Sequence, residues 1–317
     1  MALLKYILKK MLMLLPVLVG ISIIAFALGI MSPGDPVDQV LNPNGNESYT
    51  QAEYDAMAAK MGLDQPAVVQ YFNWVDGLVH GDLGRSFFTN KSVMDQLVKR
   101  IPISLKLAGF SMILTIVFGV GFGVLMAVKK DRLLDHVLGT FSTAALSVPG
   151  FWIAIVLIFL FAEQWKLLPS SGISGGSGFI LPAVTLALPS IGVCARLTRS
   201  AILDEIGRQY MTVADAKGMS RRHAVICHAF GNALIPIITY LGNHMAGIIG
   251  GASIVETIFA IPGIGSYAIA GVQSKDYYVV QAYVLFSGCI YVLTNILIDL
   301  IYIALDPKIR AGEAVES

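Results

Sequence analysis

The stretch KYILKKMLMLLPVLVGISIIAFALGI (Lys5–Ile30) begins with lysines and continues as one long apolar run. A helix needs about 20 mostly apolar residues to cross a bilayer, and this run supplies them. A cleaved secretory signal peptide has a shorter apolar region that is followed by a small-residue cleavage site, and the stretch has neither feature. We therefore interpret it as the retained first span of an all-α integral membrane protein.

The composition of the chain agrees with that interpretation. Of its 317 residues, 56% are apolar and 14% are charged, and the mean hydropathy is +0.71. Soluble proteins carry about 25% charged residues. The net charge of +1 argues against a nucleic-acid partner, which would require a basic excess. Six segments are apolar and long enough to span a membrane: residues 10–30, 103–128, 137–161, 180–203, 234–256 and 281–305.

The basic residues predict how these spans are oriented. Short cytoplasmic loops are enriched in Lys and Arg. Fourteen of the 22 Lys and Arg residues lie near the two termini, in the second loop, or in the fourth loop and its borders, all on one side of the predicted membrane. Most of the others lie in residues 31–102, a long loop in which charge has little influence on insertion. Both termini and the fourth loop are thus predicted to be cytoplasmic, and residues 31–102 external.

The external segments are predicted to contain short helices. In Ser48–Phe88, a break at GLDQP (Gly62–Pro66) separates two of them, and the second has an aromatic surface. That surface fits a helix lying on lipid headgroups, a platform for an external partner, or a lid over a pore mouth. Ser92–Pro102 is predicted to be a short amphipathic approach to the second span. A short apolar helix at Ile264–Val272 cannot span and is predicted to dip toward a pathway.

The chain lacks several motifs of common catalytic sites. It has no Gly-Lys dipeptide, which excludes a Walker phosphate-binding loop, and no His-Glu-x-x-His motif. Its histidines and three cysteines show no metal-ligand spacing. We therefore predict no catalytic residue and no metal site. An ion-driven carrier usually has ionisable groups near the bilayer midplane, and the predicted spans offer few. The energy for any transport is then expected to come from another subunit, although a self-contained channel or carrier stays open as an alternative.

One cytoplasmic segment is too polar to span yet regular in its spacing. It runs YMTVADAKGMSRRHAVICHAFGNALIP, from Tyr210 to Pro236. The pattern predicts two short helices with a turn at Gly218, where glycine permits a left-handed backbone. Small residues before the turn would let a partner surface approach closely. The alternative is an amphipathic helix on anionic headgroups, with arginines as lipid anchors.

Seven motifs along the chain resemble one family of membrane proteins. They occur in this order: SPGDP (32–36), HGDLGRSF (80–87), VPGFW (148–152), ADAKGMS with HAFGNALIP (214–236), ETIFAIPGIG (256–265), KDYYVVQ (275–281) and NILIDLIYIALDPKIR (295–310). Together they resemble the permease subunits of ATP-binding-cassette importers, in the branch that takes up peptides or nickel. The cytoplasmic segment is similar to the EAA loop of that family. Two features depart from the general pattern: Gly218 and Pro236 are far apart, as in the peptide and nickel branch, and Asp215 replaces a residue that is often basic.

The resemblance implies a fold, an activity and a set of partners. It implies the type I importer permease fold, with a first helix and external loop in residues 1–102 and a five-helix core in residues 103–317. The loop at about 205–233 would form the helix that couples transport to an ATPase. The implied partners are a second homologous permease, two cytoplasmic ATPase subunits and an extracellular substrate-binding protein, in a bacterial inner (plasma) membrane. ATP and Mg would bind to the partner subunits, and no cofactor to this chain. The implied ATPase-coupling residues are Ala214, Asp215, Ala216, Lys217, Gly218, Met219, Arg221 and Arg222.

The substrate and its pathway are less defined by the resemblance. Short peptides are the expected cargo, with nickel, a nickel chelate or a glutathione-like peptide as alternatives. The fifth span is expected to line the pathway because polar side chains facing lipid would be costly, although a structural role for its histidine is also open. For the arginines at 196 and 199 the sequence leaves two possibilities, snorkelling or pairing with Asp299. The candidate pathway residues are Asn243, His244, Gly247 and Glu256.

Overall fold

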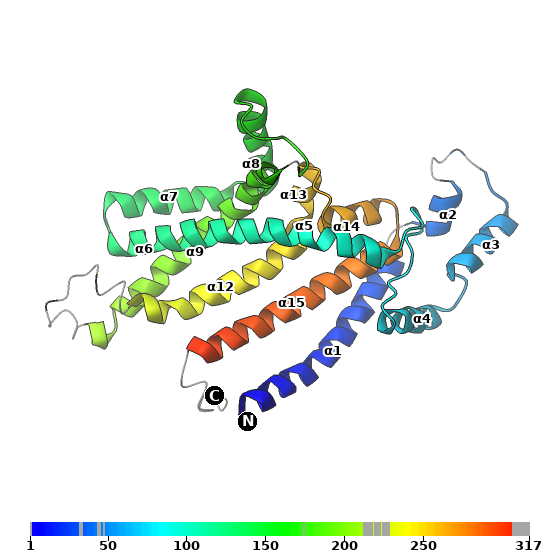
Figure 1. Cartoon of the computed structure of the whole chain (residues 1–317), viewed down its shortest axis with the longest axis horizontal. Coiled ribbons are helices and arrows are strands. Elements are labelled where there is room, and N and C mark those ends of the chain that lie inside the picture. Colours follow the sequence, from blue (N-terminus) through cyan, green and yellow to red (C-terminus); the bar gives the residue numbers. More distant parts are fainter. Residues whose placement is uncertain are drawn as a thin grey trace. The chain divides into compact units, whose positions relative to one another are not determined.

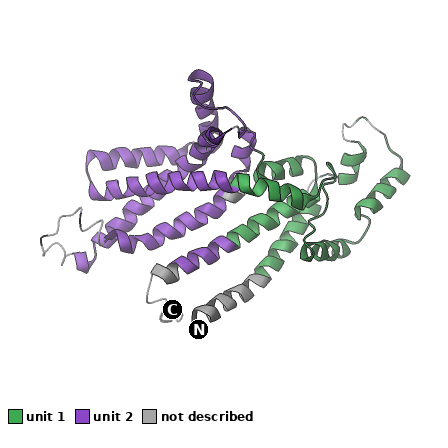
Figure 2. Ribbon diagram, viewed as in Figure 1, with its two compact units in different colours: residues 1–104, 262–292 green, residues 105–261, 293–317 purple. Residues whose placement is uncertain are grey.

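The structure is a computed structural model that describes residues 2–31, 34–42, 46, 48–173, 175–211, 218, 223 and 229–305. Within these ranges the regular secondary structure is helical, apart from one isolated bridge between Arg85 and Ser92. The chain divides into two compact units (Figure 2). Unit 1 comprises residues 1–104 and 262–292, and unit 2 comprises residues 105–261 and 293–317. Helices α5 and α15 each contribute to both units.

Unit 1 combines one long apolar helix with several short ones (Figure 1). Its elements are α1 (Ala2–Ile30), α2 (Pro36–Leu41), α3 (Gln51–Met61), α4 (Ala67–Val79), the first half of α5 (Val93–Leu114), α14 (Ile264–Gln273) and the first half of α15 (Tyr277–Leu305). Thr50 and Glu53 form a reciprocal capping box at the start of α3, and Gly62 ends that helix with φ +70. Pro66 then precedes α4. The predicted break at Gly62–Pro66 and the predicted short helix near Ile264 are confirmed.

The aromatic surface of α4 is divided between α1 and the exterior. The hydroxyls of Ser22 and Tyr71 lie 2.9 Å apart, and the ring of Phe26 meets Tyr71 edge-on at 5.3 Å between centroids. Trp74 is buried beside them, whereas Phe72 is 64% exposed. One side of α4 therefore packs within unit 1, and only the other side is available to lipid or a partner.

Unit 2 is arranged around α9 (Ile180–Ile206), which packs against α6, α7, α8 and α12. Small residues allow this close packing. A Cβ added to Gly123 would lie 2.4 Å from the Thr198 Cβ, and one added to Gly192 would lie 2.5 Å from the Ser142 carbonyl oxygen. The remaining elements are the end of α5, η1 (Thr115–Val120), α6 (Gly121–Val128), α7 (Leu133–Ser147), α8 (Gly150–Leu157), η2 (Ile158–Gln164), η3 (Gly176–Phe179), α12 (Phe230–Gly251), α13 (Ser253–Ile258) and the end of α15.

Three helical segments of the described chain are long and apolar enough to cross a membrane: Val93–Val128, Gly176–Ile206 and Tyr277–Ile301. A fourth crossing is possible if the bent pair Leu133–Ser147 and Gly150–Gln164 counts as one span. Within α1, Pro16–Ile30 is a shorter apolar helix.

Two predicted segments differ in detail from the structure. Residues 137–161, predicted as one span, fall in two helices, Leu133–Ser147 and Gly150–Gln164, which are bent by 102° relative to each other. The bend lies at Val148 and Pro149, because the residue before a proline is pushed out of the α region and Val148 has φ −90 and ψ 128. The stretch Ser92–Pro102, predicted as an amphipathic approach to the second span, is continuous with it, because α5 begins at Val93 and has Pro102 inside. Just after this proline, the Ser104 hydroxyl accepts a bond from the Ile264 N–H at 2.9 Å, which joins α5 to the start of α14.

Candidate functional site

The segment between α9 and α12, which contains the predicted coupling residues, is described at Gly218 and His223 and at its two ends. Gly218 has φ +77, the left-handed region that favours glycine. A Cβ added there would meet no atom within 4 Å, so the backbone conformation, and not crowding, is what favours glycine. The other predicted coupling residues lie outside the described residues: Ala214, Asp215, Ala216, Lys217, Met219, Arg221 and Arg222.

The two ends of this segment are fastened to each other. The Tyr210 hydroxyl donates to Glu205 at the end of α9 at 2.7 Å, and it accepts a bond from the Asn232 amide of α12 at 3.1 Å. Met211 and Ile237 are buried in one apolar cluster with residues of α6 and α9. The chain therefore leaves α9 and enters α12 at one packed base, which is the attachment that a force-transmitting segment requires.

The predicted pathway residues differ in their exposure. Asn243 and Gly247 are both exposed on α12, one turn apart. His244 stacks on Tyr240 with 5.6 Å between ring centroids, and its Nε2 is buried without a hydrogen-bond partner among the described residues. Glu256 is fully buried on α13.

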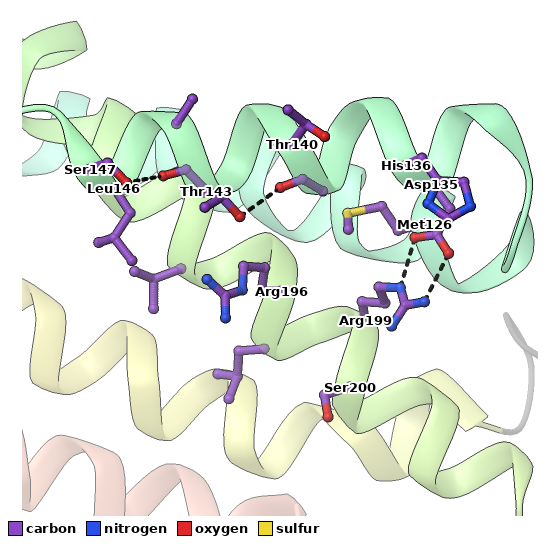
Figure 3. Close-up of a pocket in the computed structure, with 14 residues that line it drawn as sticks. Met126, Asp135, His136, Thr140, Thr143, Leu146, Ser147, Arg196, Arg199 and Ser200 are labelled. Atoms are coloured by element: carbon purple, nitrogen blue, oxygen red, sulfur yellow. Dashed lines mark hydrogen bonds and ion pairs between the residues drawn. The ribbon is translucent and has the colours of Figure 1, made fainter.

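A cavity of about 1090 Å³ lies between α7 and α9 in unit 2 (Figure 3). Arg199 points toward Asp135 at one end of it and donates two hydrogen bonds, Nε to Oδ1 at 2.7 Å and a terminal nitrogen to Oδ2 at 2.8 Å. Asp135 is only 4% exposed and also accepts the Asp131 N–H at 3.0 Å. Such a two-pronged pair is among the strongest side-chain contacts. Arg199 thus pairs with Asp135 in place of either possibility that the sequence left open.

Sequence reasoning missed Asp135 because 64 positions separate it from Arg199. A signal was present, however. An arginine within an apolar span requires a counter-charge or access to water, and Asp135 lies in the first turn of its helix, where a carboxylate is favoured by the helix dipole. Arg196, which lies one turn before Arg199, also lines the cavity.

A second polar cluster in unit 1 joins two of the motifs from the sequence. Asp276 of KDYYVVQ is 1% exposed. The Ser86 hydroxyl and the backbone N–H groups of Phe87, Phe88 and Val279 donate toward its carboxylate, whose Oδ1 is buried without a hydrogen-bond partner among the described residues. Burial raises the pKa of Asp276 above its ordinary value, and these hydrogen bonds oppose the increase. The motifs HGDLGRSF and KDYYVVQ are therefore in direct contact through one buried carboxylate.

Aromatic packing closes the same cluster. The Phe87 ring lies 4.9 Å from the Tyr278 ring and 6.2 Å from the Tyr277 ring, between centroids. Gly84 has φ +81, and a Cβ on it would lie 2.8 Å from the Tyr278 ring. Both the backbone conformation and the contact require glycine at this position. Among the described residues, no group of three or more His, Cys, Asp or Glu side chains is placed to hold a metal ion.

Known proteins match this chain in its motif order and its membrane-length helices. Residues 119–311 match the family described as "Binding-protein-dependent transport system inner membrane component", and residues 3–108 match the N-terminal region of such membrane components. The chain belongs to this family. It is therefore an inner-membrane permease component of an ATP-binding-cassette importer and not an enzyme, and the resemblance seen in its motifs is confirmed.

Curated members of the family are similar over almost their full length. A probable peptide ABC transporter permease protein of Sinorhizobium fredii is 36% identical, over 96% of this chain and 99% of the relative. The dipeptide transport system permease protein DppB of Escherichia coli is 34% identical, over 97% and 99%. The glutathione transport system permease protein GsiC of Escherichia coli is 33% identical, also over 97% and 99%.

Solved importer structures share the fold of this family member. A chain of the inward-facing MetNI methionine ABC transporter has 17% identity and a TM-score of 0.58, covering 67% of this chain and 97% of that one. A chain of an amino acid ABC transporter crystallised with histidines has 18% identity and a TM-score of 0.52, covering 65% and 92%. At this identity the similarity establishes the type I importer permease fold.

Proposed function

We propose that this chain forms half of the translocation pathway of an importer for short peptides. The observation that carries the proposal is the near full-length similarity to permeases named for peptides, dipeptides and glutathione. The other half would be a second homologous permease. An external binding protein would deliver the peptide, and two cytoplasmic ATPase subunits would bind ATP and Mg, with no cofactor on this chain.

The proposed topology has six spans with both termini in the cytoplasm. The spans are α1, α5 continuing into α6, the bent pair α7 and α8, α9, α12 and α15. Three of these segments and the bent pair have the length and apolar composition of a crossing. The 29-residue α1 and the 22-residue α12 supply the remaining two.

The coupling step would use the segment between α9 and α12. On ATP binding the two ATPases would close and draw their docked segments together, and the spans would rock between inward-facing and outward-facing arrangements, a rigid-body transition. Support comes from the base formed by Glu205, Tyr210 and Asn232, because a segment held at both ends transmits a displacement. Asn243, His244, Gly247 and Glu256 remain the proposed pathway residues.

Uptake by the complete importer tests this function. The four-subunit complex in proteoliposomes, with its binding protein outside and ATP inside, should accumulate a labelled dipeptide. A parallel panel with glutathione and a nickel chelate defines the cargo class. The chain reconstituted alone should move no substrate. Dipeptide flux without ATP or partner subunits would favour a channel or carrier and contradict the proposal.

Two variants test the coupling segment. Gly218→Asp and Ala216→Glu should abolish uptake and binding-protein-stimulated ATP hydrolysis, because each introduces a charge into the proposed ATPase contact. Membrane insertion and assembly should be unchanged. Normal stimulation and uptake in both variants would disprove the assignment.

A further inference from the structure

Two arginines line the cavity between α7 and α9, and among the described residues only Arg199 is paired with a carboxylate. Arg199 and Arg196 lie one turn apart on α9, and both line the cavity. Arg199 is bound at both ends of its guanidinium fork by Asp135. Among the described residues, Arg196 makes neither a hydrogen bond nor an ion pair. Figure 3 shows its guanidinium within the space between the two helices, directed away from Asp135.

Arg196 is an exposed residue of α9, so its guanidinium is open to a ligand that enters the cavity. It lies near one end of the predicted span at residues 180–203, where a cation requires a partner, water or a lipid headgroup. The other lining groups of the cavity include the hydroxyl-bearing residues Thr140, Thr143 and Ser200, which can form further hydrogen bonds with a polar ligand.

We propose that Arg196 binds the carboxylate of the transported peptide, an inference that rests on the function proposed above. A guanidinium presents a planar fork of N–H donors that matches a carboxylate. Asp135 does not compete for Arg196 because Arg199 already satisfies it. Every unblocked peptide has a C-terminal carboxylate whatever its side chains, so a single cation of this kind holds the peptide without selecting its sequence. The cavity of about 1090 Å³ has room for a ligand of that size.

The test uses the complete importer in proteoliposomes, with a labelled dipeptide as the probe. Arg196→Gln should raise the KM for uptake roughly tenfold to a hundredfold, the usual worth of hydrogen bonds to a charged group. Arg196→Lys, which keeps the charge but loses the fork, should recover part of the loss. Arg132→Gln removes a positive charge from an exposed residue at the start of α7, outside the cavity, and should behave as wild type. Binding-protein-stimulated ATP hydrolysis should be unchanged in all three.

Photocrosslinking reports contact with the peptide independently of flux. A photoreactive amino acid at Thr140, which lines the cavity, should capture the labelled dipeptide in the wild-type background and lose that capture with Arg196→Gln. The same probe at Phe118, outside the cavity, should capture none. Unlabelled dipeptide should compete for capture, and its C-terminal amide should compete at least about tenfold less well.

Each alternative produces a distinct result. Uptake and capture equal to wild type in Arg196→Gln would overturn the proposal and leave the peptide function standing. A defect that appears only in vesicles containing anionic lipid would assign Arg196 to a lipid headgroup. Loss of the second permease on purification of Arg196→Gln would assign it to a subunit contact. No peptide uptake by the wild-type importer would overturn the proposed function and this inference together.

Discussion

Two carboxylates, one in each unit, are buried to a similar degree by different means. Asp135 in unit 2 is 4% exposed and Asp276 in unit 1 is 1% exposed. Asp135 receives both prongs of a guanidinium at 2.7 and 2.8 Å. Asp276 receives a hydroxyl and three backbone N–H groups, none of which carries a full charge, and its Oδ1 has no hydrogen-bond partner among the described residues. Burial of a carboxylate requires compensation, and this protein uses a counter-charge in one unit and backbone donors in the other.

The difference determines what each carboxylate joins. The pair of Asp135 with Arg199 links the start of α7 to α9, two helices in the set of proposed spans. The donors around Asp276 come from the loop before α5 and from the start of α15, and they hold two distant motifs together. A change at Asp135 leaves a charge without a partner, whereas a change at Asp276 leaves only neutral donors. The predicted effects of substitution differ accordingly.

The largest effect is expected from Asp135→Ala. Removing one partner of a buried ion pair costs about 3–5 kcal/mol, and we expect about 2–4 kcal/mol here because the Arg199 side chain is 30% exposed and can gain water. Thermal unfolding of the purified importer in detergent measures the loss. The double variant Asp135→Asn with Arg199→Gln leaves no buried charge without a partner, and it should recover more than half of the lost free energy of unfolding. Equal losses in the single and double variants would show that the pair is not the cause.

A smaller loss is expected from Asp276→Ala. This change removes the acceptor of the Ser86 hydroxyl and of three N–H groups, and unsatisfied neutral donors cost about 1–3 kcal/mol. Hydrogen exchange of residues 86–88 should accelerate while exchange around Asp135 stays constant. A larger loss of stability in Asp276→Ala than in Asp135→Ala would contradict the expected order.

The pH dependence of unit 1 should also depend on Asp276. Its pKa is raised in the folded protein from 3.8, so the folded carboxyl keeps its proton at pH values where the unfolded carboxyl has lost it. The stability contributed by this group is therefore greatest below that value and is lost as the pH rises from 3.8 through the folded pKa. Hydrogen exchange of residues 86–88 across this window should accelerate with pH beyond its intrinsic increase. Asp276→Asn should remove the excess, and an unchanged slope in that variant would assign it to another group.

The smallest effect on stability is expected from Arg196→Leu. This arginine has no ion pair among the described residues, so its loss leaves no opposite charge stranded, and substitutions of this kind usually change stability by less than about 0.5 kcal/mol. The unfolding temperature in detergent should match that of the wild type. An unchanged temperature would separate stability from the transport defect predicted for the same position. A decrease comparable to that of Asp135→Ala would mean that Arg196 is structural and would attribute the transport defect to lost stability.

Several elements were predictable from local signals. The break at Gly62–Pro66 was predicted because a left-handed glycine and a proline both interrupt helices, and the helix at Ile264–Gln273 was predicted from its apolar run after a Pro-Gly turn. The bend at Val148 and Pro149 was missed, although a proline was present, because hydropathy alone treats residues 137–161 as one apolar segment. The continuity of α5 through Pro102 was not predicted, because an internal proline usually ends a helix; the contacts of this part of α5 with residues 263 and 264 join segments that are far apart in the sequence.

The sequence by itself determined that the chain is an all-α membrane protein with the motifs of an importer permease, because apolar length and short motifs are properties of neighbouring residues. Tertiary structure alone decided which charges meet. Arg196 and Arg199 are identical in type and lie one turn apart on α9. The packing of α7 against α9 gives a counter-charge to Arg199 and none to Arg196 among the described residues. Likewise, Asp276 meets Ser86 only after folding. Electrostatic compensation depends on distances of a few ångströms between residues far apart in the chain, and no local pattern encodes those distances.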